Sequence, residues 1–311
     1  MQIADAQLAS RSDLKPRWRS LLFVPAILDR FFERAIDAKP DAIIIDLEDS
    51  IPIEQKEFAR RQVRETAAVL RRAGADVLVR INRPLSLAVR DIEASIGADV
   101  CAIMVPKAGG AYHLKLLCEV IDEIENGCGI PGRTKIVPLV EDAEAVCRLK
   151  EIAEGERVVA IACGDEDLAA NLGCAPESQT LVSVKHQLVL AAGAAGCQPL
   201  GLIGTITEYR DLDRFRAAAR SSCAAGLTGS LCIHPSQVTI ANKEFAPSQE
   251  AVEWALRVIA RADDAQRMGQ AVTSLDGKMI DQPVVRRARE ILQFHIKDER
   301  GGAYPCLSVC V

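Results

Sequence analysis

Short apolar segments rich in β-branched residues recur along the chain, and longer amphipathic segments separate them. Eight of them have the length and composition of buried strands: 20–25, 42–47, 77–81, 101–105, 135–140, 158–162, 199–203 and 230–233. Helical periodicity occupies 28–38, 53–73, 111–125, 142–154, 181–194 and 211–225. Strands that alternate with helices indicate βα units, so the sequence predicts an α/β fold of the TIM (β/α)₈ barrel type.

This alternation stops after the eighth predicted strand. A helical pattern at 249–265 is followed by a stretch with glycines at 268–277 and by a last helix at 284–297, just after Pro283. We therefore expect three parts: an N-terminal arm at 1–18, the barrel at 19–246, and a C-terminal helical extension with a tail at 247–311.

The net charge and the cysteines limit the kinds of binding partner and the cellular compartment that we expect. The formal net charge is −5, so no basic field is available to attract nucleic acid. The eleven cysteines are an odd number and none forms a CxxC pair, which argues against a zinc cluster and a disulfide framework. A reducing, cytoplasmic setting is the expected one.

Hydropathy gives no sign of a membrane. The first 17 residues have no apolar core of the kind that secretory signals carry, and the most apolar later stretch, at 188–196, is too short to cross a bilayer. We expect neither a secretory signal nor a membrane partner.

Charged residues follow several of the predicted strands, where the active site of a barrel lies. Arg80 lies near the end of the third run, directly before Ile81. The carboxylates at the ends of the second, fifth and sixth runs are Asp46, Glu48, Asp49, Glu141 and Asp167. A site rich in oxygen ligands and poor in histidine suits Mg²⁺ or Mn²⁺ rather than zinc.

Each of these residues also has a structural interpretation. Glu141 and Asp167 could be acids of first helical turns, which the helix dipole favours. The acids after the second run could solvate a loop, and Arg80 could be an ordinary ion-pair partner. Only their joint arrangement favours a site.

Motifs along the chain carry a family resemblance. They lie at 19–25 (Arg-Ser-Leu-Leu-Phe-Val-Pro), 45–50 (Ile-Asp-Leu-Glu-Asp-Ser), 79–82, 105–107, 138–141, 164–173 (beginning Gly-Asp-Glu-Asp-Leu), 233–237 and 277–283. In these motifs and in their order the sequence resembles the citrate lyase β-subunit-like proteins of the HpcH/HpaI aldolase/citrate lyase superfamily.

The resemblance implies roles for particular residues. Glu141 and Asp167 would hold Mg²⁺, with Mn²⁺ as a substitute, and Glu141 would also contact the substrate. Arg80 would bind the substrate carboxylate, and Arg19 would line the same pocket. Asp46, Glu48 and Asp49 would act through metal-bound waters. The C-terminal extension would be a lid that closes over a neighbouring subunit of a homotrimer or hexamer. It would bring the catalytic Asp281, which acts together with Arg80.

The implied activity is that of a carbon–carbon lyase of the oxo-acid-lyase type. Such an enzyme cleaves or forms a 3-hydroxyacyl-CoA thioester, for example malyl-, citramalyl- or citryl-CoA, and its products are a 2-oxo acid and an acyl-CoA. Coenzyme A enters as part of the substrate. Three alternatives stay open: a metal-dependent aldolase on free hydroxy-keto acids, a malyl-CoA thioesterase, and a non-catalytic subunit of a citrate lyase-type complex.

The sequence departs from the family pattern at several places near these motifs. Ala26-Ile27 replaces a Gly-Asn pair, Asp142 stands where Thr or Ser is usual, and Asn171 stands where Asp is usual. Asp165 replaces a common Ala.

Overall fold

The computed structural model describes residues 17–27, 29–270 and 272–300. The chain forms two compact units, of which the first ends at Asn242 and the second begins at Lys243. The predicted arm at 1–18 and the predicted tail lie almost wholly outside the described residues, so the division into three parts stays a prediction. Within the described ranges, none of the helices combines the length and the hydropathy that a bilayer crossing requires.

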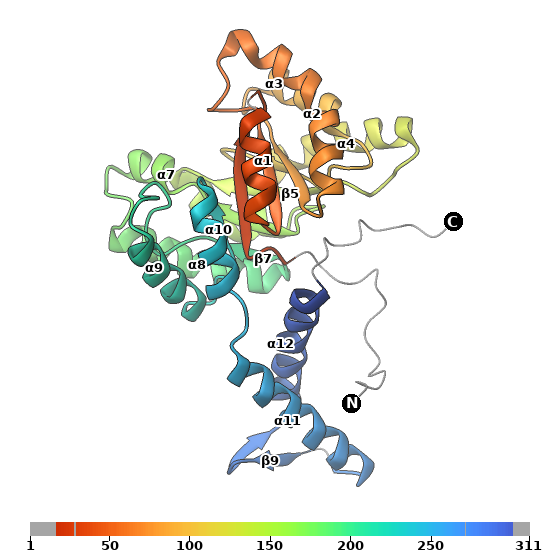
Figure 1. The fold of residues 1–311 in the computed structure, drawn as a ribbon, viewed down its shortest axis with the longest axis vertical. Coiled ribbons are helices and arrows are strands. Elements are labelled where there is room, and N and C mark those ends of the chain that lie inside the picture. The colour runs from red at the N-terminus through yellow and green to blue at the C-terminus, as the bar shows by residue number, and fades with distance from the viewer. Residues whose placement is uncertain (1–16, 28, 271, 301–311) are drawn as a thin grey trace. The chain divides into compact units, whose positions relative to one another are not determined.

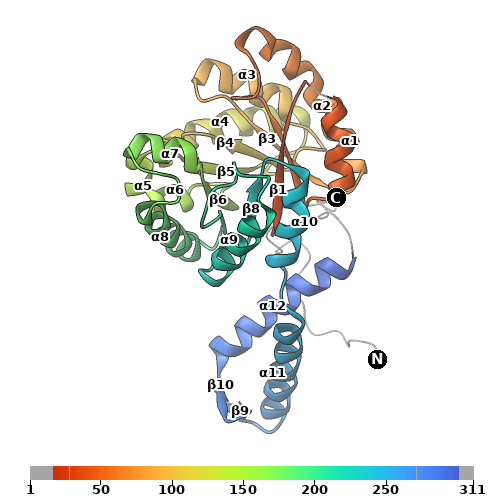
Figure 2. The same ribbon diagram turned by 60° about the vertical axis from the view of Figure 1, so that its left-hand side comes forward.

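Eight parallel strands form the wall of the first unit (Figures 1 and 2). They are β1 (Ser20–Pro25), β2 (Ala42–Asp46), β3 (Asp76–Arg80), β4 (Ala102–Val105), β5 (Lys135–Val140), β6 (Ala160–Cys163), β7 (Gln198–Leu200) and β8 (Ser230–Cys232). Their order is β7-β6-β5-β4-β3-β2-β1-β8. Gly201 N–H donates to the Gly229 carbonyl at 2.9 Å and Thr228 N–H to the Pro199 carbonyl at 3.0 Å, so backbone bonds also link the two ends of this order. The barrel predicted from the sequence is confirmed.

Helices surround these strands (Figure 2). They are α1 (Asp29–Ala38), α2 (Lys56–Arg72), α3 (Leu85–Ser95), α4 (Ala111–Cys128), α5 (Ala143–Cys147), α6 (Leu149–Ala153), α7 (Asp165–Leu172), α8 (Gln179–Ala195), α9 (Leu212–Ala224) and α10 (Pro235–Glu244). A short 3₁₀ turn at Ile53–Gln55 precedes α2. The helix predicted at 142–154 is broken at Arg148 into α5 and α6, and the sequence did not predict α3, α7 or α10.

Apolar side chains from all eight strands fill the inside of the barrel. Ile44, Leu78, Met104 and Leu139 are among its buried members, so the barrel is a packed core and not a pore. Trp18 joins this cluster from just before β1 and is held at the amino ends of the strands. Its indole N–H donates to Asp76 Oδ2 at 2.8 Å. Gly229 leaves room for the Trp18 backbone, because a Cβ at that position would lie 1.9 Å from the Trp18 carbonyl oxygen.

The second unit is a helical hairpin with a small two-stranded sheet. Its elements are α11 (Gln249–Arg267), β9 (Thr273–Leu275), β10 (Lys278–Ile280) and α12 (Gln282–Arg300). β9 and β10 pair antiparallel through a tight turn in which Asp276 and Gly277 both have positive φ. Ala255, Val258, Ile280 and Ala288 belong to its own buried apolar cluster.

Candidate active site

A cavity of about 470 Å³ opens at the carboxyl ends of the barrel strands. Most of its walls come from residues near the carboxyl ends of strands or in the loops after them, as the parallel topology requires. The lining residues are Phe23, Pro25, Asp46, Asp49, Ser50, Arg80, Leu139, Glu141, Cys163, Gly164, Asp165, Glu166, Asp167, Gly201, Leu202, Ile206, Thr207, Ser230, Leu231 and Ile233. Most of the predicted site residues therefore share one cavity.

Arg80 lies among three carboxylates. Its guanidinium binds Asp46 bidentately, with Nε to Oδ1 at 2.7 Å and Nη2 to Oδ2 at 2.8 Å. Nη1 lies 3.0 Å from Glu48 Oε2 and 3.3 Å from Asp49 Oδ2. Burial alone would raise the pKa of Asp46, but the hydrogen bonds and charge of Arg80 outweigh it and hold that pKa below its ordinary value. The guanidinium also lies over the Phe23 ring, 4.8 Å from its centroid.

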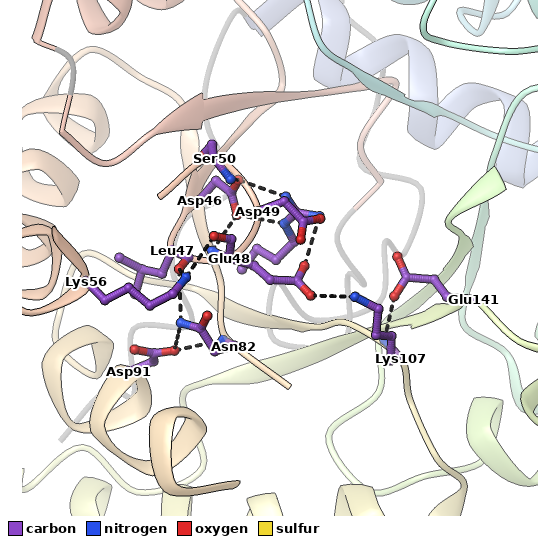
Figure 3. A network of polar contacts seen from close by, with 11 residues as sticks. Asp46, Leu47, Glu48, Asp49, Ser50, Lys56, Asn82, Asp91, Lys107 and Glu141 are labelled. Atoms are coloured by element: carbon purple, nitrogen blue, oxygen red, sulfur yellow. Dashed lines mark hydrogen bonds and ion pairs between the residues drawn. The ribbon is translucent and has the colours of Figure 1, made fainter. Parts of the chain in front are cut away.

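Lys107 connects two of the acids. Figure 3 shows Glu48, Lys107 and Glu141 in a row, with Lys107 in the middle. The Lys107 ammonium lies 3.1 Å from Glu48 Oε1, and its backbone N–H donates to Glu141 Oε2 at 2.6 Å. Lys107 has a φ of 46°, a left-handed conformation that is costly for a residue with a side chain. The sequence motif at 105–107 contains this lysine, but the motif alone does not indicate its role.

Glu141 is the buried acid of the proposed metal pair. Its burial, together with the negative charges of Glu48 and Asp167, raises its pKa to about 7 against the opposing hydrogen bond from Lys107. Gly164 leaves the space that Glu141 occupies, because a Cβ there would lie 2.3 Å from Glu141 Oε1. A buried carboxylate with a raised pKa next to other acids is stabilised by a bound cation.

Asp167 lies on the first turn of α7, beside two acids that are already held. Asp165 Oδ2 lies 3.0 Å from the ammonium of Lys185, a fully buried lysine of α8. Glu166 Oε1 accepts a hydrogen bond from the Thr205 hydroxyl at 2.8 Å. Asp167 is exposed to the cavity and makes no hydrogen bond or ion pair within the described part of the chain. The Asp165–Lys185 pair was not predicted, since nothing in the spacing of the two residues indicates their contact.

Glu141 and Asp167 together fit a magnesium site. Over the residues that the structure describes, no group of three or more His, Cys, Asp or Glu side chains could by itself hold a metal ion. Mg²⁺ commonly uses only one or two protein carboxylates and completes its octahedron with waters and substrate oxygens. The two carboxylates concentrate negative charge, which attracts a cation, and open space lies beside them. This arrangement matches that donor set.

A second layer of polar contacts holds the loop after β2. The Lys56 ammonium donates to the carbonyls of Leu47 and Glu48 at 2.8 and 2.9 Å. Asn82 donates to the Leu47 carbonyl at 3.0 Å and to Asp91 at 2.7 Å (Figure 3). These contacts fix the backbone that carries Glu48 toward the cavity.

Arg19 is not part of this cavity. It precedes β1, and its guanidinium is ion-paired with Asp41, the residue before β2, at 2.9 Å. Both residues therefore lie at the amino ends of the strands, opposite the carboxyl ends where Arg80 and Glu141 lie. The expectation that Arg19 lines the same pocket as Arg80 is therefore corrected. Arg19 precedes β1, and that strand runs from Arg19 toward the pocket at its other end.

Asp281 lies in the second unit, at the start of α12. Its Oδ1 accepts a hydrogen bond from Val284 N–H at 3.2 Å, as a helix-capping acid does. Its catalytic role stays a prediction.

Two of the departures from the family pattern have structural explanations. Asp142 caps α5, because its Oδ1 accepts from Ala145 N–H at 2.7 Å, a role that Ser or Thr also fills. Asn171 Oδ1 accepts from Ala143 N–H at 2.9 Å, a bond that an aspartate oxygen would also make. Neither residue is among those that line the cavity.

Comparisons with known proteins identify the family to which the chain belongs. The family model for HpcH/HpaI aldolase/citrate lyase matches residues 19–235. The chain belongs to the HpcH/HpaI aldolase/citrate lyase family. It is 34% identical over 284 residues to citrate lyase subunit beta of Escherichia coli (strain K12), which covers 88% of this chain and 92% of that protein. It is 27% identical over 288 residues to the mitochondrial citramalyl-CoA lyase of Rattus norvegicus, covering 88% and 85%.

A protein of known structure has the same fold. The structure of the protein CitE from Mycobacterium tuberculosis in complex with magnesium, acetoacetate and coenzyme A matches with a TM-score of 0.68 and 30% identity. The match covers 90% of this chain and 98% of that one. The family assignment made from the sequence motifs is confirmed.

Proposed function

We propose that this protein is a Mg²⁺-dependent carbon–carbon lyase that acts on a 3-hydroxyacyl-CoA thioester and yields a 2-oxo acid and an acyl-CoA. The observation that carries this proposal is the cavity in which buried Glu141, exposed Asp167 and Arg80 meet at the carboxyl ends of the strands. Relatives named as a citrate lyase subunit and a citramalyl-CoA lyase, and a solved relative with magnesium and coenzyme A, support it.

Glu141 and Asp167 would hold the metal ion. When bound, Mg²⁺ supplies Lewis-acid polarisation of the substrate's hydroxyl or keto oxygen and a template for its orientation. Glu141 is held from one side by the Lys107 backbone N–H, which leaves Oε1 free of that contact. Lys107 and Arg80 hold Glu48 in place beside the pair.

Arg80 would bind the carboxylate of the 2-oxo acid. The guanidinium of Arg80 already binds Asp46 bidentately. Its contact with Asp49 is longer, and the Asp49 carboxylate is 61% exposed. We infer that a substrate carboxylate replaces Asp49 beside Nη1, because this is the contact that costs least to break. Asp46 then keeps the guanidinium in position.

The cleavage needs one proton removed and one proton delivered. The substrate hydroxyl loses its proton, the bond between the hydroxyl-bearing carbon and the carbon next to the thioester breaks, and its electron pair passes to the thioester enolate. A proton then reaches that carbon and gives the acyl-CoA. We propose Asp281 as the group that exchanges these protons, in line with the resemblance of the motif at 277–283.

A homo-oligomer follows from the same proposal. Asp281 would enter a neighbouring subunit's cavity, with a trimer or hexamer as the expected assembly. The second unit exposes Leu256, Met268, Val272 and Met279, which are large apolar side chains of the kind that protein interfaces cover. We place the protein in the cytoplasm, because its cysteines are odd in number and form no CxxC pair.

The test is acyl-CoA release from malyl-, citramalyl- and citryl-CoA, measured with Mg²⁺ and with excess chelator. Release should require the metal and should fall by at least about a hundredfold in Asp167→Asn. Asp213→Asn, an exposed aspartate of α9, is the matched control and should leave the rate unchanged. Tight Mg²⁺ binding without cleavage of any of the three thioesters would exclude the lyase.

A further inference from the structure

The cavity at the carboxyl ends of the strands has two chemically different halves. The charged half comes from β2, β3, β5 and β6, with Asp46, Arg80 and Glu141 among its residues. The other half comes from β1, β8 and the segments that follow β7 and β8. Its apolar side chains are Phe23, Leu202, Ile206, Leu231 and Ile233.

The polar groups of this second half are already engaged. The Thr207 hydroxyl lies 2.7 Å from that of Thr205, and both contact Glu166. The Ser230 hydroxyl is buried and donates to the Leu231 carbonyl at 2.9 Å. Leu202 is 1% exposed, and Ile206 packs against the buried apolar cluster of the barrel. This wall offers a ligand hydrocarbon contact.

Positive charge in the cavity is limited and committed. Among the described residues that line it, Arg80 is the single cation, against the six acids Asp46, Asp49, Glu141, Asp165, Glu166 and Asp167. The nearby Lys107 is paired with Glu48, and Lys185 with Asp165. Asp165 Oδ1 is buried without a hydrogen-bond partner among the described residues. A ligand carboxylate on that side would meet acids and no free cation.

A 2-oxo acid places three groups on its carbonyl carbon: the keto oxygen, the carboxylate and a side group. Under the proposed function, on which this inference rests, the first two bind at Glu141, Asp167 and Arg80 in the charged half. The side group is then left to face the opposite half.

We propose that this side group is a small alkyl chain, and that Ile206 and Leu231 select it. The oxo acid is therefore of the pyruvate or 2-oxobutyrate type. Oxaloacetate, with a second carboxylate, is excluded by charge, and glyoxylate, with only hydrogen, leaves the wall without contact. Each alkyl carbon buried in such a pocket improves binding by about tenfold or more, while an unpaired buried carboxylate weakens it by at least about tenfold.

The experiment is calorimetric binding of pyruvate, 2-oxobutyrate, glyoxylate and oxaloacetate to the full chain with Mg²⁺ present, alongside cleavage of the corresponding hydroxyacyl-CoA thioesters. We expect both alkyl acids to bind about tenfold or more tightly than oxaloacetate, with the same order in kcat/KM. Ile206→Arg should reverse the order between oxaloacetate and 2-oxobutyrate. Leu190→Arg, on an exposed site of α8 that does not line the cavity, should leave it unchanged.

The outcomes separate this inference from the function beneath it. Thioester cleavage with a preference for the dicarboxylate, or equal binding of oxaloacetate and pyruvate by the unaltered protein, overturns the alkyl preference and leaves the lyase standing. Absence of both cleavage and Mg²⁺-dependent oxo-acid binding overturns the two together. The comparison within the unaltered protein decides the matter even if Ile206→Arg does not fold.

Discussion

At the scale of single residues, Glu141 shows how burial prepares a side chain for a metal. It is 4% exposed, and its pKa is raised to about 7, chiefly by desolvation. An acid whose pKa is higher in the folded state than in the unfolded state stabilises the fold only at low pH. That contribution is full below the ordinary value of 4.5 and is lost as the pH rises through about 7. Without metal, the charged form is therefore a cost above neutrality.

Replacing this carboxylate by an amide should remove the cost. In the presence of a chelator, we expect Glu141→Gln to be more stable than the unaltered protein at pH 8, by on the order of 2 kcal/mol, and equally stable near pH 4.5. Mg²⁺ should stabilise only the unaltered protein. Thermal unfolding at the two pH values is the measurement, with Glu123→Gln, an exposed glutamate of α4, as control. Identical differences at both pH values would contradict the assignment.

At the scale of elements, the junction between β6 and α7 determines where the acidic side chains of the site can lie. Gly164 ends the strand segment and precedes α7, with φ −92° and ψ 94°, a conformation that alanine also adopts. Glycine is required here for a steric reason. The side chain of Glu141, at the end of the neighbouring strand, occupies the space where a Cβ would lie. Glu141, held against this junction, lines the same cavity as Asp167.

Adding one methyl group at this junction should displace Glu141. We expect Gly164→Ala to weaken Mg²⁺ binding by at least about tenfold and to destabilise the fold by roughly 1–3 kcal/mol. Gly127→Ala is the matched control, since Gly127 lies in α4 with nothing within 4 Å of its added Cβ. That control should stabilise the protein slightly, by about 0.5–1 kcal/mol. Magnesium titration calorimetry distinguishes the two, and unchanged affinity in Gly164→Ala would count against the site.

At the scale of the whole molecule, the chain divides its proposed chemistry between two units. The barrel carries Arg80, Glu141 and Asp167, and the second unit carries Asp281. The second unit has a buried apolar cluster of its own, so it is a folded element with its own core. Such a division is the arrangement that an exchange of units between subunits requires.

Mixing two inactive variants tests that exchange. Glu141→Ala supplies an intact second unit, and Asp281→Asn supplies an intact barrel. If Asp281 serves a neighbouring subunit, co-refolded mixtures at equal ratio should regain about a quarter of the unaltered activity, because one site in four then combines two intact halves. If each chain serves itself, the mixture stays inactive. Each variant refolded alone is the control.

Much of the fold could be predicted because strand burial is encoded locally. Continuous apolar runs gave the bounds of β1 and β5 as observed, since a strand buried on both faces needs no partner to be recognised. The runs for β6 and β7 were displaced by one to three residues at their ends. α7 was missed because it has eight residues, three of them acids in the first turn, and little amphipathic periodicity.

The site was predictable where it depends on strand direction. Arg80, Glu141 and Asp167 follow apolar runs, and parallel strands bring such positions to one rim. The same rule excludes Arg19, which directly precedes its strand. Lys107 and the Asp165–Lys185 pair required the structure, because their partners lie 59 and 20 positions away along the chain.

The sequence by itself determined the barrel, the family and the set of acids at one end of the strands, because each of these follows from local pattern and from the direction of the chain. The tertiary structure decided the raised pKa of Glu141, the bidentate hold of Asp46 on Arg80, and the apolar half formed after β7 and β8. These properties depend on desolvation and on distances between residues from different strands, and only packing sets those.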